Sequence, residues 1–231
     1  MLLSKYSQIT ESVLSSATGS ISDKHRHEAL EAASYWTRQQ TAECADRAAE
    51  IFHRLYDEQE AQPHVHIAPP IEHVAYCIDV YRLNSGSPYD VPSKGTLATK
   101  AEALLTQAEK HSSSVSVGSE LEDDHLTTQV YNMVLDAYSE IGDHEACDRI
   151  LKQMKERCKS DPLAMVHPDS VSYNILLKAL NNSNSPYAPM RSEEVLQRMQ
   201  NMADAGDGEV APTATSFSTV ISCWEIGRAH V

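Results

Sequence analysis

The 231-residue sequence contains little of what most chemical sites are built from. Its eight glycines form no nucleotide-binding cluster, so phosphate-loop chemistry is not indicated. Its five cysteines are odd in number and widely spaced, with no Cys-x-x-Cys pair, which argues against a disulfide scaffold and fits a reducing compartment. No apolar run approaches the roughly 20 residues that a membrane-spanning helix needs, so we exclude a membrane protein.

Positive charge is also scarce. The chain has 19 Lys and Arg against 33 Asp and Glu, which gives a formal charge of −14. Indiscriminate binding to a phosphate backbone needs dense Lys and Arg, so this class of protein is not favoured. Any affinity for nucleic acid would have to come from base contacts and stacking, and we expect such binding by this chain to be weak.

No group of polar side chains resembles a catalytic or metal site. Scattered Ser, His and Asp residues make no recognisable nucleophile and base, so we predict no catalysis. Two histidine groups could ligate zinc or nickel, but they lie near prolines or at a helix start, without a cysteine pair. These groups are His64, His66 and His73, and His25 with His27. We predict that they are solvated and that the chain holds no metal and no cofactor.

Apolar residues recur with helical spacing in four segments. Each segment has the i, i+3, i+4, i+7 pattern that places small and apolar side chains on one helical face. The first residues of the segments are separated by 53, 46 and 45 positions. The four sets are Ala48-Ile51-Phe52-Leu55, Ala101-Leu104-Leu105-Ala108, Cys147-Ile150-Leu151-Met154 and Ser192-Val195-Leu196-Met199.

Another helix is predicted before each of these segments. The apolar positions of these helices align with one another in three segments. The aligned sets are Tyr131, Val134, Leu135 and Tyr138; Tyr173, Leu176, Leu177 and Leu180; and Phe217, Val220, Ile221 and Trp224. We interpret these side chains as packing between repeats. Two helices that recur together along the chain, with no β-type alternation between them, predict an all-α fold, a right-handed α-solenoid of tandem helix-turn-helix repeats.

The helix breakers agree with this division. All ten prolines are predicted to lie outside the helices, since a proline inside a helix would cost ~3 kcal/mol. Ile141-Gly142-Asp143 is predicted to be a tight turn between the two helices of one repeat. Two polar stretches are predicted to be solvated: residues 204–209, and a disordered acidic and serine-rich insertion near residues 111–125.

The predicted organisation is about four helical hairpins and the start of a fifth over residues 28–224, after a segment, 1–27, to which no element is assigned. Reverse translation of residues 225–231 can read GAG ATC GGA AGA GCA CAC GTC, which from its second base resembles the start of a widely used sequencing adapter. We therefore expect these residues to be an artefact at the end of a truncated transcript; the alternative is an ordinary helix end. Met1 could equally be an internal methionine, so we expect the chain to be incomplete.

Two of the predicted first helices open in the same way. Val130-Tyr131-Asn132 and Val171-Ser172-Tyr173-Asn174 each place valine and a tyrosine-asparagine pair before an apolar helix, and a second helix follows. His167-Pro168-Asp169 and Ala211-Pro212-Thr213 then close the repeats. In these features the chain resembles the pentatricopeptide repeat family.

This resemblance is good over Thr128–Trp224. It is weaker over Glu28–Ser112, where His73-Val74-Ala75-Tyr76 replaces the tyrosine-asparagine pair. The repeats are also longer than the family's usual length of about 35 residues, with the excess in loops, where insertions are tolerated.

The resemblance implies sequence-selective binding of single-stranded RNA, one base per repeat. In the family, the asparagine after the tyrosine and the last residue of the repeat face the base edge. Here these residues are Asn132 with Asp169, and Asn174 with Thr213. The first pairing favours uracil in the family, and the second leans towards a pyrimidine. Ser218 has the asparagine's place in the last repeat.

The family also stacks a side chain between neighbouring bases, and Gln129, Val171 and Thr215 stand at that position. In the weaker region, Ala75 cannot hydrogen-bond a base edge. The chemistry agrees with the resemblance, because an amide both donates and accepts, and a carboxylate accepts from the imide N–H of uracil. The alternative is that Asn132 and Asn174 only cap or stabilise local helix starts.

The resulting prediction is a non-catalytic protein that binds single-stranded RNA and supports maturation, stability or translation of an organellar transcript. Residence in a mitochondrion or plastid is implied by the resemblance alone, and protein partners are a further expectation. One rival is a tetratricopeptide-like scaffold that holds a protein segment, since the net charge of −14 suits a basic partner. The other is the RNA-positioning part of an enzyme whose catalytic domain lies beyond Trp224.

Overall fold

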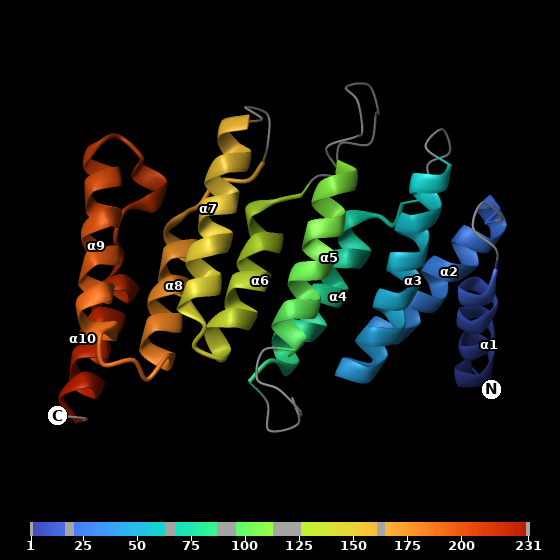
Figure 1. The fold of residues 1–231 in the computed structure, drawn as a ribbon, viewed down its shortest axis with the longest axis horizontal. Coiled ribbons are helices and arrows are strands. Elements are labelled where there is room, and N and C mark those ends of the chain that lie inside the picture. The colour runs from blue at the N-terminus through green and yellow to red at the C-terminus, as the bar shows by residue number, and fades with distance from the viewer. Residues whose placement is uncertain are drawn as a thin grey trace. The chain divides into compact units, whose positions relative to one another are not determined.

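The fold is seen in a computed structural model of the chain (Figure 1). It describes residues 2–16, 21–62, 68–86, 96–112, 126–160 and 165–229, and these contain ten α-helices, one short 3₁₀ helix and no β-strand. The chain divides into two compact units, each described by itself below. Unit 1 comprises Met1–Asn84 and Thr99–Leu126, and unit 2 comprises Ser85–Ala98 and Thr127–Val231.

Unit 1 contains α1 to α4 and most of α5. Neighbouring helices pack on one another: α1 on α2 and α3, α2 on α3 and α4, and α3 on α4. The first of them lies within residues 1–27, to which the sequence analysis assigned no element. The bounds are α1 Leu2–Ser15, α2 Asp23–Thr37, α3 Ala42–Ala61, α4 Ile71–Asn84 and α5 Thr96–Ser112.

The core of unit 1 forms around the apolar face of α3. Thr41 starts this helix by accepting a hydrogen bond from the Cys44 backbone N–H. The apolar positions predicted in α3 and α5 are buried, and each large side chain among them contributes about 1.5–3 kcal/mol before entropy is counted. Trp36 of α2 is also buried and donates from Nε1 to Thr10 Oγ1 of α1 at 3.0 Å. The helical spacing thus correctly predicted which face of these helices is inside.

A buried ion pair fastens the connection between α1 and α2 to α3. Glu58 is 0% exposed and accepts from Arg54 Nη1 at 2.9 Å. The same carboxylate accepts from the Ile21 backbone N–H at 3.1 Å, while Arg54 Nη2 donates to the Ser16 carbonyl at 3.1 Å. Both sides of the α1–α2 connection are therefore held by one charged pair on α3.

Unit 2 is a layered stack of helical hairpins. The first helices of its repeats contact one another in succession, α6 on α8 and α8 on α10, and the second helices α7 and α9 pack beside them (Figure 1). The described elements are α6 Thr128–Glu140, α7 His144–Ser160, α8 Ser170–Asn182, α9 Ala188–Asp204, the 3₁₀ helix η1 Gly208–Val210 and α10 Ala214–Ala229.

The core of unit 2 is the interface between first and second helices. All the aligned apolar side chains predicted for α6 and α8 are at most 5% exposed. The same holds for Cys147, Ile150, Leu151 and Met154 of α7. Successive packing of helical hairpins confirms the predicted all-α, α-solenoid class of fold. Its right-handedness stays a prediction.

The turn predicted at Gly142 is confirmed. The first helix of the hairpin ends at Glu140 and the second begins at His144, with Gly142 at φ +74° between them. A Cβ atom on Gly142 would lie 2.6 Å from the Asn182 carbonyl oxygen at the end of α8. Glycine is required here both for its left-handed backbone and for its lack of a side chain.

The prediction that every proline lies outside the helices is wrong at one position. Pro189 lies in the first turn of α9, where its missing N–H has no helical partner to lose and its fixed φ suits the helix. The other described prolines, Pro69, Pro70, Pro168, Pro186 and Pro212, lie outside helices as predicted. Pro63, Pro88, Pro92 and Pro162 lie outside the described residues.

The packing role predicted for α10 is also only partly correct. Val220 is 6% exposed, but Phe217 and Ile221 are 49% and 59% exposed, because no described second helix covers that face. The polar stretch 204–209 is exposed as predicted, and it ends in η1. Of the predicted insertion, residues 113–125 lie outside the described residues. The helical course of α10 to Ala229 does not test the predicted origin of residues 225–231.

Candidate functional site

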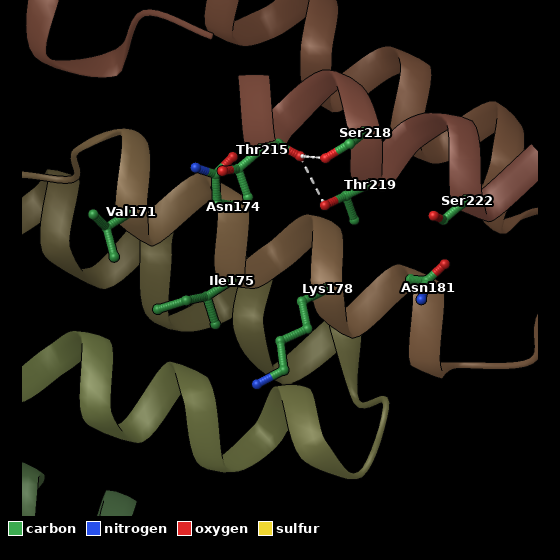
Figure 2. A pocket seen from close by; sticks show the side chains of 9 residues that line it. All are labelled: Val171, Asn174, Ile175, Lys178, Asn181, Thr215, Ser218, Thr219 and Ser222. Atoms are coloured by element: carbon green, nitrogen blue, oxygen red, sulfur yellow. Dashed lines mark hydrogen bonds between the residues drawn. The ribbon is translucent and has the colours of Figure 1, made fainter. Parts of the chain in front are cut away.

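A hollow of about 440 Å³ lies between the first helices α8 and α10 (Figure 2). We call this surface the groove, and it is lined by Val171, Asn174, Ile175, Lys178, Asn181, Thr215, Ser218, Thr219 and Ser222. Four of the eight predicted RNA-contacting residues are among them. The first helices α8 and α10 alone therefore supply the lining.

Asn132 of α6 reaches the residue that precedes α8. Its Nδ2 lies 3.5 Å from Asp169 Oδ1, and its Oδ1 accepts a hydrogen bond of 2.7 Å from Ser172 Oγ. Ser172 Oγ also lies 2.8 Å from Asp169 Oδ1, so its single proton sits between two acceptors. The predicted pair is thus brought together in space although 37 residues separate its members.

The neighbours of Asn132 fix the orientation of its amide. Its carbonyl oxygen faces a hydroxyl donor, and its N–H faces the carboxylate of Asp169. The reversed amide would place a carbonyl oxygen against that carboxylate, with no proton between them. The amide is therefore oriented by the protein itself.

The same arrangement occurs one repeat later. Asn174 Nδ2 donates to Thr213 Oγ1 at 3.2 Å, and Ser216 Oγ donates to Asn174 Oδ1 at 2.6 Å. Ser216 Oγ also accepts from the Thr213 backbone N–H at 2.9 Å. Both predicted pairs therefore share one geometry: asparagine, the last residue of the repeat, and a serine of the next helix.

The capping role belongs to Asp169 and not to Asn132. Asp169 Oδ1 accepts from the Ser172 backbone N–H at 2.8 Å, and Ser172 Oγ accepts from the Asp169 N–H at 3.2 Å, which is a capping box at the start of α8. Asn132 lies inside α6 and bonds to the next repeat, as Asn174 does in α8. The asparagines are therefore not local caps.

Sequence reasoning missed Ser172 and Ser216, which are 0% exposed. The available signal was their spacing, because each follows the last residue of its repeat by three positions, as a capping box requires. Each serine orients an asparagine while satisfying the backbone of its own helix.

The segment before α8 is held in place by α6 and α7. The Thr128 N–H donates to the Met165 carbonyl at 3.1 Å, and the His167 N–H donates to Thr128 Oγ1 at 2.9 Å. On the other side, Cys158 Sγ lies 3.0 Å from His167 Nδ1. Two residues further along the chain, Asp169 is thereby positioned opposite α6.

The predicted stacking residues are all exposed. Gln129, Val171 and Thr215 each lie three positions before the predicted reading residue of the same helix, so each pair shares one helical face. Ser218 is exposed too, and its hydroxyl donates to the Thr215 carbonyl at 3.0 Å (Figure 2). Their placement is as expected, and their roles stay predictions.

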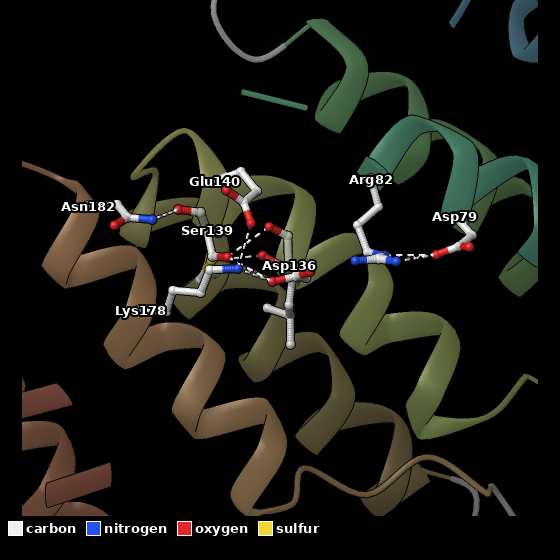
Figure 3. A network of polar contacts seen from close by, with 9 residues as sticks. Asp79, Arg82, Asp136, Ser139, Glu140, Lys178 and Asn182 are labelled. Atoms are coloured by element: carbon white, nitrogen blue, oxygen red, sulfur yellow. Dashed lines mark hydrogen bonds and ion pairs between the residues drawn. The ribbon is translucent and has the colours of Figure 1, made fainter. Parts of the chain in front are cut away.

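Lys178 of α8 is tied to α6 by two carboxylates (Figure 3). Its Nζ lies 2.6 Å from both Asp136 Oδ1 and Glu140 Oε1. Burial alone would lower the pKa of Lys178, but the hydrogen bonds and charges of these two carboxylates raise it overall. The lysine therefore stays charged, and its ammonium is held against α6 at the edge of the groove.

Unit 1 has a different set of residues at the matching positions of α4. Ala75 stands where unit 2 has asparagine and has no side-chain donor or acceptor. Asp79 stands where α6 has Asp136, and it pairs with Arg82 of its own helix at 2.8 Å (Figure 3). Base-edge recognition is therefore a prediction for unit 2 only.

Within the part of the chain that the structure describes, the other titratable groups form no second candidate site. Burial raises the pKa of the Cys77 and Cys147 thiols, so neither is a ready nucleophile. Among the described residues, no group of three or more His, Cys, Asp or Glu side chains is placed to hold a metal ion. In the same residues, no helix is long and apolar enough to cross a membrane.

The fold and the groove define a helical-repeat protein. No protein-family model matches the chain. A pentatricopeptide repeat-containing protein of Arabidopsis thaliana is 28% identical to it over 124 residues, which is 53% of this chain. The match covers 19% of that protein, so the chain spans about a fifth of the length of its curated relative. The all-helical repeats of unit 2 are compatible with this similarity.

Proposed function

We propose that the chain binds single-stranded RNA through unit 2 and distinguishes bases with the pairs Asn132–Asp169 and Asn174–Thr213. One observation carries the proposal: the same hydrogen-bonded arrangement of asparagine, repeat-end residue and buried serine occurs in two successive repeats. The similarity to a pentatricopeptide repeat-containing protein supports it.

The two pairs differ in what they can recognise. Asp169 contacts Asn132 and Ser172 through Oδ1. Its second carboxylate oxygen, Oδ2, also has lone pairs that can accept hydrogen bonds. That oxygen can accept from the N3–H of uracil, whereas the N3 of cytosine is itself an acceptor. Thr213 carries a hydroxyl, which donates or accepts, so it tolerates either pyrimidine.

Binding of this kind must rely on the bases. Between Thr127 and Thr213 the chain has 8 Lys and Arg against 13 Asp and Glu, so the electrostatic contribution of the phosphates is small. Stacking on aromatic platforms contributes about 1–3 kcal/mol per base, and the predicted stacking side chains here are Gln, Val and Thr, which offer less. Weak, base-selective binding by this chain is the expected result.

The biological role is part of the same proposal, and the family resemblance supports it. A chain that holds a transcript without catalysing a reaction would shield it or guide its maturation or translation in a mitochondrion or plastid. Its own residues would supply recognition, and any chemistry would come from a partner.

The test compares Asn132→Ala and Asp169→Asn with the natural sequence. Asn keeps the helix cap at position 169 but replaces an acceptor with an amide. We expect both variants to lose about tenfold in affinity for RNA with uracil at one register, and to lose little for RNA with another base there. Fluorescence anisotropy with two oligonucleotides that differ at that base measures both.

Asn201→Ala is the matched control, because Asn201 is an exposed asparagine of α9, on the layer of second helices. It should leave affinity and selectivity unchanged. Equal selectivity in all four proteins would contradict the proposal. Binding of a basic peptide, with no RNA binding at low salt, would instead support a protein scaffold.

A further inference from the structure

The groove carries one positive charge. Of the eight Lys and Arg between Thr127 and Thr213, seven lie on the second helices α7 and α9, and Lys178 alone lies on a first helix. Its side chain lines the groove one helical turn after Asn174 along α8, and Figure 2 shows its ammonium directed towards α6. A cation close to a residue that contacts a base is well placed to contact the phosphates of the bound strand.

This charge is already engaged within the protein. Asp136 and Glu140, both from α6, lie 2.6 Å from Lys178 Nζ, with side chains 19% and 40% exposed. Lys178 itself is 39% exposed. Ion pairs with this much access to water are weak and exchange partners readily. The contact therefore neutralises the lysine without burying it.

We propose that Lys178 is the phosphate-binding residue of the groove, and that a bound phosphodiester competes with Asp136 and Glu140 for its ammonium. This inference rests on the proposed function, since it assumes a single-stranded nucleic acid in the groove. Binding then exchanges two carboxylate contacts for one phosphate contact. The two carboxylates of α6 thereby lower the affinity for every RNA sequence by the same factor. Selectivity between sequences then comes from the base contacts alone.

Unit 1 shows what the same carboxylate does without a lysine on the next first helix. Asp79 occupies the position of Asp136, and Arg82 from the same helix neutralises it. The pairing of Lys178 with Asp136 and Glu140 joins α8 to α6, the two first helices that also carry the asparagine pairs. Lysine suits this exchange because its ammonium is a compact charge that can turn from one acceptor to another.

The experiment is a mutant cycle on the full chain with a single-stranded oligouridylate. Lys178→Met should weaken binding about three- to tenfold and reduce the slope of log affinity against log salt by about 0.7. Asp136→Asn with Glu140→Gln should strengthen binding by a similar factor, because the lysine is released. In the triple variant that gain should largely disappear. Circular dichroism confirms that the near-isosteric variants fold.

Two controls separate this exchange from general charge effects. Lys152→Met removes a positive charge from an exposed position on α7 and should change binding less than twofold. A methylphosphonate oligomer with the same bases has an uncharged backbone, so Lys178→Met should not weaken its binding.

An equal gain from the carboxylate variants with and without Lys178 would overturn the inference, since it would show simple charge repulsion. Loss of methylphosphonate binding in Lys178→Met would overturn it too. Both results leave base reading by Asn132 intact. The proposed function fails separately if the natural chain binds neither oligomer at low salt, and this inference then falls with it.

Discussion

The two units pack helices in the same way but use their polar residues differently. In unit 1 the fully buried carboxylate of Glu58 holds the α1–α2 connection against α3. In unit 2 the buried hydroxyls of Ser172 and Ser216 orient asparagines on the first helices. A helical hairpin therefore needs no particular polar residue to stack. The buried polar groups of this chain thus anchor a connection in unit 1 and orient amides of the first helices in unit 2.

Different substitutions are therefore expected to destabilise unit 1 and unit 2. The two tryptophans of the chain allow them to be followed separately, because Trp36 belongs to unit 1 and Trp224 to unit 2. Replacing one of them with Phe leaves a fluorescence signal from the other unit alone.

The largest expected effect is that of Glu58→Ala on unit 1. The change leaves the guanidinium of Arg54, 10% exposed, without its carboxylate and frees the Ile21 N–H. Loss of one partner of a buried ion pair costs about 3–5 kcal/mol, so the free energy of unfolding from Trp36 fluorescence in urea should fall by that amount.

The matched control for Glu58 is Glu156→Ala, which removes the carboxylate of an exposed pair with Lys152 on α7. This change should cost at most about 0.5 kcal/mol. A loss below about 1 kcal/mol for Glu58→Ala would show that the buried pair is not what anchors α1 and α2.

A smaller effect is expected from Gly142→Ala in unit 2. The new Cβ would be strained by the left-handed backbone and would meet the Asn182 carbonyl at 2.6 Å, so we expect a loss of about 2–4 kcal/mol. Gly206→Ala is the control, since it has φ +104° but nothing within 4 Å, and should cost about 1–2 kcal/mol. Equal losses in the Trp224 signal would mean that close packing of the α6–α7 turn on α8 is unimportant.

The smallest effect is a pH dependence in unit 1. Burial is the main cause that lowers the pKa of His73 and of His111 below the ordinary 6.5, and His111 stacks on Tyr56 at 4.7 Å. A lowered pKa in the folded chain means that the unfolded chain binds more protons, so stability present above pH 6.5 is lost as the pH falls. The urea midpoint from Trp36 should decrease between about pH 7 and pH 5.

The corresponding control is the double variant His73→Gln with His111→Gln. It should flatten the dependence, because neither position can then take up a proton. A midpoint that falls as steeply in the double variant as in the natural chain would assign the loss to other groups.

The sequence by itself determined the repeats. Apolar residues at helical spacing can be buried on one side only if the chain forms amphipathic helices, and recurrence of the same pattern requires those helices to stack. The tight turn at Gly142 could also be predicted from the sequence, because few other residues adopt its backbone conformation. The exposure of one face of α10 could not be predicted from the sequence, since it depends on which helices lie beside α10.

Only the tertiary structure decided how the polar residues combine. Asn132 and Asp169 were paired through a family resemblance. The capping-box spacing links Ser172 to Asp169, but nothing in the sequence links that serine to Asn132, or the carboxylates of α6 to Lys178. Ser172 lies 40 positions from Asn132, and Lys178 lies 42 positions from Asp136. Hydrogen bonds and ion pairs form only within a few ångströms, so these partners meet only because α6 and α8 pack side by side.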